Sequence, residues 1–289
     1  MYQPLECRPD SYQEWYKQGN KLRAEGYYEE ALASYERAIN YKPRDYWSWY
    51  RKGVVLEAMG YYEEAINSYT KANNIEPDNY WSWYEQGCIY FTAFARYKQA
   101  IACFEKALAA HPQDYWAIYR LAESWRRLGE YHQAIDYYNR ALELRPQDFW
   151  ACFRRGEAQQ QWGNPKLALQ SYDSALNIEP DDYWTWYQRG IVLQQLERFS
   201  EAIASYDCAL NLEDRFDPAW YQKGCCYAKL DNVNWAIMSL EQAIDLHPEK
   251  YLDLAAKAPV WSKYRPKTGF QLLLTNKSRK YNVSHSGEV

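Results

Sequence analysis

Apolar residues recur along the chain at a spacing that indicates amphipathic helices. Trp49, Gly53 and Leu56 occupy positions i, i+4 and i+7, which lie on one face of an α-helix. A second segment with the same spacing follows, in which small and aromatic residues such as Ala65 and Tyr69 alternate. The pattern therefore predicts pairs of helices that pack against each other through these faces.

The paired pattern repeats with a nearly constant period. Seven residues open successive units, and the steps between them are 34, 34, 35, 34, 34 and 34 residues. These residues are Tyr12, Tyr46, Tyr80, Tyr115, Phe149, Tyr183 and Asp217. A fixed period of this length is typical of an array in which each unit packs only on its neighbours.

Helix-terminating and helix-capping residues fall where the period requires them. Glycines that suit a left-handed C-cap stand between the two helices of a unit, at Gly26, Gly60, Gly129 and Gly163. Prolines that end the second helix are Pro43, Pro77, Pro112, Pro146, Pro180 and Pro248. Candidate N-caps for the next first helix are Asp45, Asn79, Asp114, Asp148 and Asp182. Ser11 and Glu14 predict a capping box at the start of the array.

These residues together resemble the tetratricopeptide repeat. Counted from the opening residue, most units carry Trp at position 4, Gly at position 8, Ala at positions 20 and 27, an aromatic residue at position 24 and a closing Pro. The resemblance covers about residues 12–250. The richness in Tyr and Trp is similar to cyanobacterial arrays of this family.

The resemblance implies an all-α fold, a solenoid that forms a right-handed superhelix of seven helix pairs with a C-terminal capping helix. The expected units are 12–45, 46–79, 80–114, 115–148, 149–182, 183–216 and 217–250, after a lead at 1–11. The capping helix is expected at 251–261, ending near Ala258 because of Pro259. Residues 262–289 form a basic tail, flexible by default, whose apolar segment GFQLLL at 269–274 could instead dock on the array or bind a partner.

A second face of each first helix lies opposite the packed face, at positions 2, 5, 6, 9, 12 and 13. In the family this face lines a concave groove where partners bind. Position 2 holds Trp in five units, and position 5 holds Tyr or Phe in all seven. The face carries eight basic residues, Lys17, Arg23, Arg51, Arg120, Arg126, Arg127, Arg154 and Lys229. It carries four acidic ones, Glu57, Glu85, Glu123 and Glu157.

Two interpretations of the aromatic residues compete. In the first they fill seams between neighbouring first helices, which is common for Tyr at position 5. In the second they are anchors for a partner, since Trp, Tyr and Arg dominate the energetics of protein interfaces. The two are compatible, because one ring can fill a seam with one edge and face a partner with the other.

Composition narrows the function classes. The net charge is −4, which disfavours general affinity for nucleic acid because nucleic acid is also negatively charged. No apolar run reaches the length of a membrane helix, and the N-terminus lacks a signal-peptide pattern. The seven cysteines show no metal-binding spacing, which suggests reduced thiols and a cytoplasmic location. Isolated histidines and the absence of phosphate-loop or nucleophile motifs predict no catalytic residue, metal or cofactor.

The sequence therefore predicts a non-enzymatic scaffold or assembly adaptor that binds an extended segment or helix of another protein. The predicted partner-binding residues are Trp47, Tyr50, Arg51, Trp81, Tyr84, Trp116, Tyr119, Arg120, Arg127, Trp150, Phe153, Arg154, Trp184 and Tyr187. Single-stranded RNA binding, which uses aromatic stacking platforms, and a regulatory subunit of an enzyme are the alternatives. Self-association and peripheral association with a membrane complex stay open.

Overall fold

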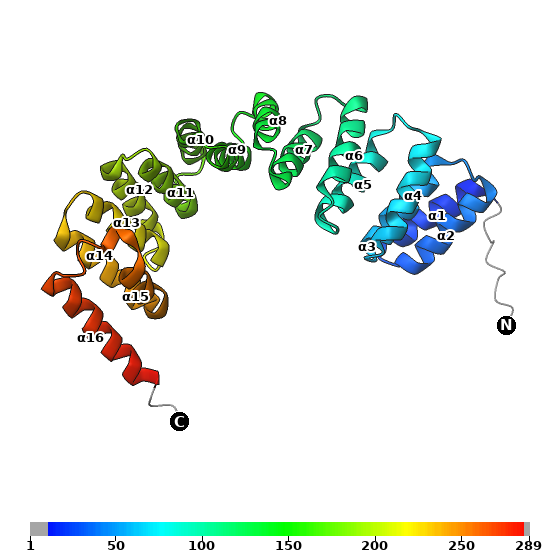
Figure 1. Cartoon of the computed structure of the whole chain (residues 1–289). Helices are drawn as coiled ribbons and strands as arrows, with labels where there is room; N and C mark the ends of the chain where they lie inside the picture. Colours follow the sequence, from blue (N-terminus) through cyan, green and yellow to red (C-terminus); the bar gives the residue numbers. More distant parts are fainter. Residues whose placement is uncertain (1–10, 286–289) are drawn as a thin grey trace. The chain divides into compact units, whose positions relative to one another are not determined.

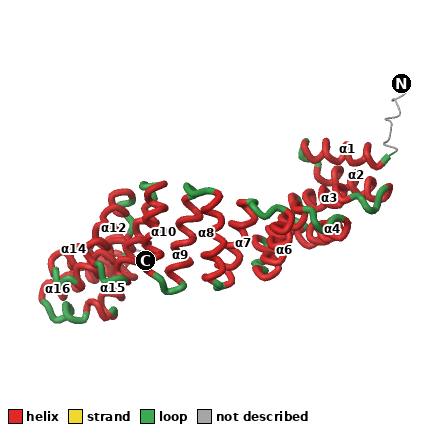
Figure 2. The backbone as a smooth tube through the Cα atoms, turned by 90° about the horizontal axis from the view of Figure 1, so that it is seen from above, coloured by secondary structure: helices red, strands yellow, loops and turns green. Residues whose placement is uncertain are grey.

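The computed structural model describes residues 11–285. Within this range the chain is all-helical, with sixteen α-helices, one 3-10 helix and no strand (Figure 1). Short loops connect the helices (Figure 2). The chain divides into two compact units between Arg145 and Pro146.

The first unit contains four helix pairs. Its helices are α1 (Tyr12–Ala24), α2 (Tyr28–Tyr41), α3 (Tyr46–Ala58), α4 (Tyr62–Ile75), α5 (Tyr80–Thr92), α6 (Tyr97–Ala110), α7 (Tyr115–Leu128) and α8 (Tyr131–Leu144). The two helices of each pair pack on each other, and α2, α4 and α6 also contact the first helix of the next pair. Each repeat therefore packs on its sequence neighbour, as a repeat array requires.

The second unit contains three more pairs and a closing segment. Its helices are α9 (Phe149–Gln161), α10 (Pro165–Ile178), α11 (Tyr183–Gln195), α12 (Phe199–Leu212), α13 (Asp217–Lys229), α14 (Val233–Leu246), α15 (Pro248–Lys257), η1 (Pro259–Trp261) and α16 (Thr268–His285). Here α10 contacts α11 and α12 contacts α13, so the packing of the first unit is repeated.

The predicted caps are confirmed. The side chain of Asp45 accepts a hydrogen bond from the backbone N–H of Ser48 at 3.0 Å, and Ser11 accepts one from Glu14 at 3.3 Å. Asn79, Asp114, Asp148 and Asp182 cap their helices in the same way. Gly60 and Gly129 adopt positive φ angles of 81° and 86°, which explains why glycine ends these first helices.

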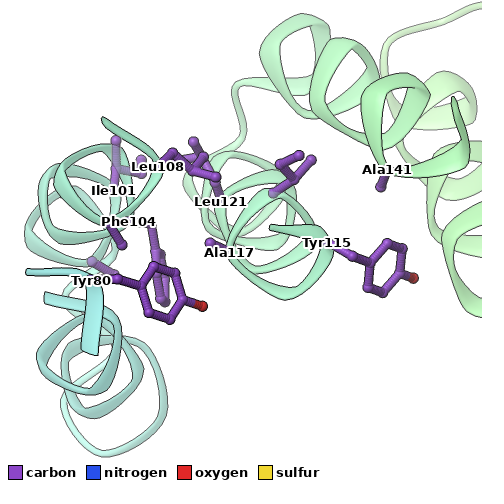
Figure 3. Packing of buried hydrophobic residues seen from close by; sticks show 11 residues of the cluster. Tyr80, Ile101, Phe104, Leu108, Tyr115, Ala117, Leu121 and Ala141 are labelled. Atoms are coloured by element: carbon purple, nitrogen blue, oxygen red, sulfur yellow. The ribbon is translucent and has the colours of Figure 1, made fainter. Parts of the chain in front are cut away.

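The interior of a repeat is a ring packed over a glycine. Tyr69 of α4 is fully buried and lies directly over Gly53 of α3. In the next repeats, side chains of α6 such as Leu108 point toward Ala117 and Leu121 of α7, so one hydrophobic core joins successive pairs (Figure 3). The small residue predicted at position 8 is therefore required by the close approach of a ring.

Buried phenols connect the second and third repeats to the helix start of the repeat that follows each of them. The hydroxyl of Tyr46 donates to the Asn79 Oδ1 atom at 2.7 Å and accepts from the backbone N–H of Ser82 at 3.2 Å. The hydroxyl of Tyr80 donates to Asp114 Oδ1 at 2.8 Å. Since Asn79 and Asp114 are N-caps, the second and third repeats each hold the residue that caps the following first helix.

Replacing Tyr46 by phenylalanine is expected to lower the free energy of unfolding by about 1–2 kcal/mol, because the buried partners of its hydroxyl lose a hydrogen bond. Urea denaturation followed by circular dichroism measures the change. Tyr61→Phe is the control, because Tyr61 is exposed and should respond by less than about 0.5 kcal/mol. Equal stability of the Tyr46→Phe variant and the wild type would contradict the proposed link between repeats.

The C-terminal segment corrects the default expectation of a flexible tail. As Pro259 predicts, α15 ends before Ala258, but residues 268–285 then form α16, which packs on α14 and α15. Phe270 and Leu273 of the apolar segment are buried, so docking on the array is the alternative that the structure confirms. A flexible tail is wrong for residues 262–281, because Tyr264, Phe270 and Leu273 are buried in one cluster with residues of α13 and α14.

Polar contacts add to this docking. Lys277 Nζ lies 2.9 Å from Glu241 and 2.6 Å from Asp245, and the hydroxyl of Tyr281 donates to Asp245 at 3.0 Å. Trp261 is fully buried ahead of α16, beside the core of α13 and α14. The basic residues of the tail are therefore partly used to hold it on the acidic side of α14.

Candidate protein-interaction face

The tryptophans at position 2 are exposed in the first unit. Trp47, Trp81 and Trp116, near the N-termini of α3, α5 and α7, retain 41%, 49% and 52% of their accessible surface. Each ring stands edge-on to the buried Tyr that precedes it, with centroid distances of 5.1–5.2 Å. The indoles are thus supported on one side by the core and open to solvent on the other.

The second unit repeats this arrangement. Trp150 and Trp184, near the N-termini of α9 and α11, are 55% and 40% exposed. Trp150 lies edge-on to the buried ring of Phe149 at 5.2 Å. Trp184 instead leans on Tyr187 and on Phe216 from the loop before α13, at 5.5 and 5.8 Å.

The tryptophans at position 4 turn inward, as the sequence predicts. Trp49, Trp83 and Trp186 are half-buried, and the indole N–H of each donates to the carbonyl of the proline that closes the preceding repeat, at 2.8–2.9 Å. The two tryptophans of each Tyr-Trp-Ser-Trp-Tyr segment therefore have different roles. One holds a loop to its helix and the other is exposed. Within each unit, we call the surface at positions 2, 5, 6, 9, 12 and 13 of the first helices the aromatic face of that unit.

The rings at position 5 belong mainly to the interior. Tyr50 and Phe153 are buried, and each packs against the ring at position 24 of its own repeat, at 5.8 and 5.7 Å. Tyr84, Tyr119 and Tyr187 make the same contact but stay half-buried. Both rings pack on an aromatic residue from the second helix of their own repeat, so contact of Tyr50 or Phe153 with a partner stays a prediction.

The predicted arginines differ in their solvent exposure and in their ion pairing. Arg127 is exposed, whereas Arg51 and Arg120 are half-buried, with their guanidinium groups 5.5 Å from the ring of Tyr50 and 5.7 Å from that of Phe91. Arg154 is also half-buried and forms a 2.7 Å ion pair with Glu157. The structure thus brings Arg154 to Trp150, at 5.6 Å, but partly neutralises its charge.

One basic residue of the site was missed by the sequence interpretation. The guanidinium of Arg145, in the loop after α8, lies 4.1 Å from the ring centroid of Tyr115 and 5.1 Å from that of Trp116. His111 occupies the equivalent loop place beside Tyr80, at 5.2 Å. The signal that could have revealed both is their position immediately before the closing proline.

The acidic residues of the first unit offset little of the positive charge of the aromatic face. Glu123 is buried and bound by Arg126 through two hydrogen bonds of 2.9 and 3.0 Å. Burial, together with the charge of Glu57, raises the pKa of Glu85 to about 7. Burial also raises the pKa of Glu57, while a hydrogen bond from the Tyr69 hydroxyl opposes this shift. At neutral pH Glu85 therefore carries only part of a negative charge.

An open cavity of about 560 Å³ lies beside one of the exposed indoles. Its lining residues are Tyr80, Trp81, His111, Pro112, Gln113 and Asp114. The cavity joins the start of α5 to the loop before α7, so an indole, a proline ring and polar groups face one space. This composition suits a peptide side chain that has both apolar and polar atoms.

Family profiles decide the classification. Profiles described as TPR repeat or tetratricopeptide repeat match residues 19–60, 48–79, 82–114, 115–148 and 217–250, which together make up more than half of the chain. The chain is a tetratricopeptide-repeat protein. A profile described as protein prenyltransferase alpha subunit repeat matches residues 165–196, where the structure has α10 and α11.

Solved structures share the fold of this tetratricopeptide-repeat protein. A TPR repeat-containing protein from Cytophaga hutchinsonii has a TM-score of 0.68 at 15% identity, over 82% of this chain and 98% of that one. YrrB, titled a TPR protein with an unusual peptide-binding site, has a TM-score of 0.58 at 22% identity, over 66% and 98%. MamA from Desulfovibrio magneticus RS-1 has a TM-score of 0.55 at 21% identity, over 60% of this chain and 98% of that one. No curated protein matches the sequence.

The family assignment carries a general expectation for chemistry. Tetratricopeptide repeats typically mediate protein–protein interaction and are generally non-catalytic. Within residues 11–285 no group of three or more His, Cys, Asp or Glu side chains is placed to hold a metal ion. In the same range no helix has the length and apolarity needed to cross a bilayer.

Proposed function

We propose that this protein is a scaffold or assembly adaptor that holds an extended segment or a helix of another protein on its aromatic face. The observation that carries the proposal is an exposed tryptophan that recurs at one helical position in five repeats. Each of these residues retains 40–55% of its accessible surface. A soluble protein rarely exposes large rings in regular series unless they contact something.

Physical arguments favour a protein as the partner. An indole gives a large contact area at a small cost in conformational entropy, and the T-shaped contacts with buried rings hold it in place before binding. Arginines beside the rings add ion pairs and cation–π contacts. The process that we propose for the complex is the assembly of photosynthetic or other large membrane complexes, with this protein in the cytoplasm.

The test is a comparison of captured proteins. Trp81→Ala combined with Trp116→Ala is expected to lower the recovery of a specifically captured protein at least tenfold, because two anchors are removed. Trp162→Ala is the matched control, since Trp162 is 50% exposed but follows α9 outside the aromatic face. Circular dichroism should be unchanged in both variants, because neither substitution empties the core.

The outcomes are distinct. Unchanged capture by the double variant would contradict a binding role for the indoles. Captured material that disappears after ribonuclease treatment and binds less at high salt would favour RNA as the ligand instead. Recovery of an enzymatic activity together with the captured protein would favour a regulatory subunit.

A further inference from the structure

The charge of the aromatic face in the first unit is the starting point. Arg51, Arg120 and Arg127 come from α3 and α7, and within the described part of the chain no ion pair holds any of them. Arg145 adds a fourth cation over Tyr115 and Trp116. These groups lie among exposed indoles on a chain whose net charge is −4, so they form a local excess of positive charge.

The acidic groups nearby do not cancel this excess. The charge of Glu123 is taken up by Arg126, and the hydroxyl of Tyr138 also donates to it. Glu57 and Glu85 are half-buried, and burial favours their protonated forms. In the second unit, by contrast, Arg154 is paired with Glu157. The unpaired arginines of the aromatic face are therefore those of the first unit.

The spacing of the indoles restricts the geometry of a ligand. Trp81 and Trp116 stand on α5 and α7, which contact each other, and packed helices lie about 8–10 Å apart. A polyproline II chain has three residues per turn and rises about 3.1 Å per residue, so its side chains recur on one side at about 9 Å. Every third residue of an extended segment can thus meet a successive indole.

From this arrangement we infer, on the basis of the scaffold function proposed above, that the aromatic face of residues 12–145 binds an acidic polypeptide segment in extended conformation. Apolar side chains at every third position lie on Trp81 and Trp116. Carboxylates at the positions between them pair with Arg51, Arg120, Arg127 and Arg145. The cavity beside Trp81, which Pro112 also lines, accepts a proline or similar ring of the segment.

A peptide series tests the chemistry directly on the full chain. Fluorescence anisotropy would compare labelled peptides of four Glu-Glu-Pro, four Gln-Gln-Pro and four Lys-Lys-Pro triplets. We expect the acidic peptide to bind at least tenfold more tightly than the neutral one, and the basic one to show no binding. The acidic peptide should bind more weakly as the salt concentration is raised, because ion pairs between exposed groups are screened.

Two matched pairs of substitutions assign the contacts. The double variant Arg51→Gln/Arg120→Gln is expected to bind the acidic peptide about tenfold more weakly than the wild type. The double variant Trp81→Ala/Trp116→Ala is expected to lose affinity to the same extent. Arg37→Gln with Arg140→Gln removes the same charge from exposed positions of α2 and α8 and should leave affinity unchanged. Thermal melts of all variants establish that each is folded.

The possible failures separate the two proposals. Binding of the basic peptide as tightly as the acidic one, or an Arg51→Gln/Arg120→Gln variant with wild-type affinity, would overturn the acidic segment while the indole-dependent capture stands. Tighter binding of an oligouridine than of the acidic peptide would overturn it in favour of nucleic acid. If the double tryptophan variant still captures its protein, the scaffold function itself fails.

Discussion

Replacing Glu85 by glutamine is expected to raise the free energy of unfolding by about 3 kcal/mol at pH 8 and to leave it nearly unchanged at pH 4. The pKa of Glu85 is about 7 in the folded protein, against an ordinary value of 4.5. The folded state therefore keeps a proton that the unfolded chain releases between these two values, and stability falls as the pH rises through this range. Glutamine is neutral at every pH and avoids that loss.

The physical cause is the environment of the carboxyl group. Burial is the main factor, the charge of Glu57 on α3 adds to it, and a hydrogen bond from Tyr50 acts in the opposite direction. From α4 the Tyr69 hydroxyl is directed at Glu57, to which it donates at 2.9 Å. Arg120 of α7 faces Cys88, whose pKa burial and Glu85 raise to about 12. No cation of this region neutralises Glu85 enough to restore its ordinary pKa.

The measurement is urea denaturation at pH 4, 6 and 8, followed by circular dichroism. Glu105→Gln on α6 is the control, because Glu105 is exposed and should change stability by less than about 0.5 kcal/mol at any pH. If the gain from Glu85→Gln were the same at pH 4 and pH 8, the cause would be packing and the assigned burial of charge would be incorrect.

A valine at Gly53 is expected to lower the free energy of unfolding by about 3 kcal/mol or more. A Cβ atom built on Gly53 would lie 2.6 Å from the ring of Tyr69, which is fully buried and cannot leave its site without opening the core. Overpacking of this kind costs about 1–3 kcal/mol, and a β-branched side chain adds χ1 restriction inside a helix. Thermal and urea denaturation would both measure the loss.

Two comparisons separate overpacking from helix propensity. Gly53→Ala shares the close Cβ contact with Tyr69 but lacks the two further methyl groups of valine, so it should cost less. Ala122 occupies the equivalent place in the fourth repeat, where the ring of Tyr138 is still fully buried. Asn67→Val places the same residue on an exposed face of α4 and reports the propensity effect alone. A Gly53→Val variant no less stable than Asn67→Val would show that the ring can move aside.

The fold was largely predictable because its determinants are local and repeated. The N-caps, the glycines with positive φ and the prolines recur at one phase, so an error in any single unit is corrected by the others. Trp49 and Trp47 could be assigned to opposite faces from the helical period alone, and their half-buried and exposed states agree with that assignment.

The features that were missed depend on contacts that a helical period does not encode. Tyr50 is buried whereas Tyr84 stays half-buried at the same position, since accessibility also depends on the neighbouring repeat. Arg145 reaches Trp116 from a loop, where periodicity gives no direction. The tail has an amphipathic stripe, but its docking follows from acidic partners on α14 that lie more than thirty residues earlier.

The closing segment has a consequence for how copies of this protein can assemble. A repeat array with an uncovered apolar end can stack head-to-tail on another copy and extend into a filament, because such contacts do not close on themselves. Trp261, Tyr264 and Phe270 are fully buried against α13 and α14, so they occupy the surface that an added repeat would use. Linear polymerisation through this end is therefore blocked unless α16 is displaced.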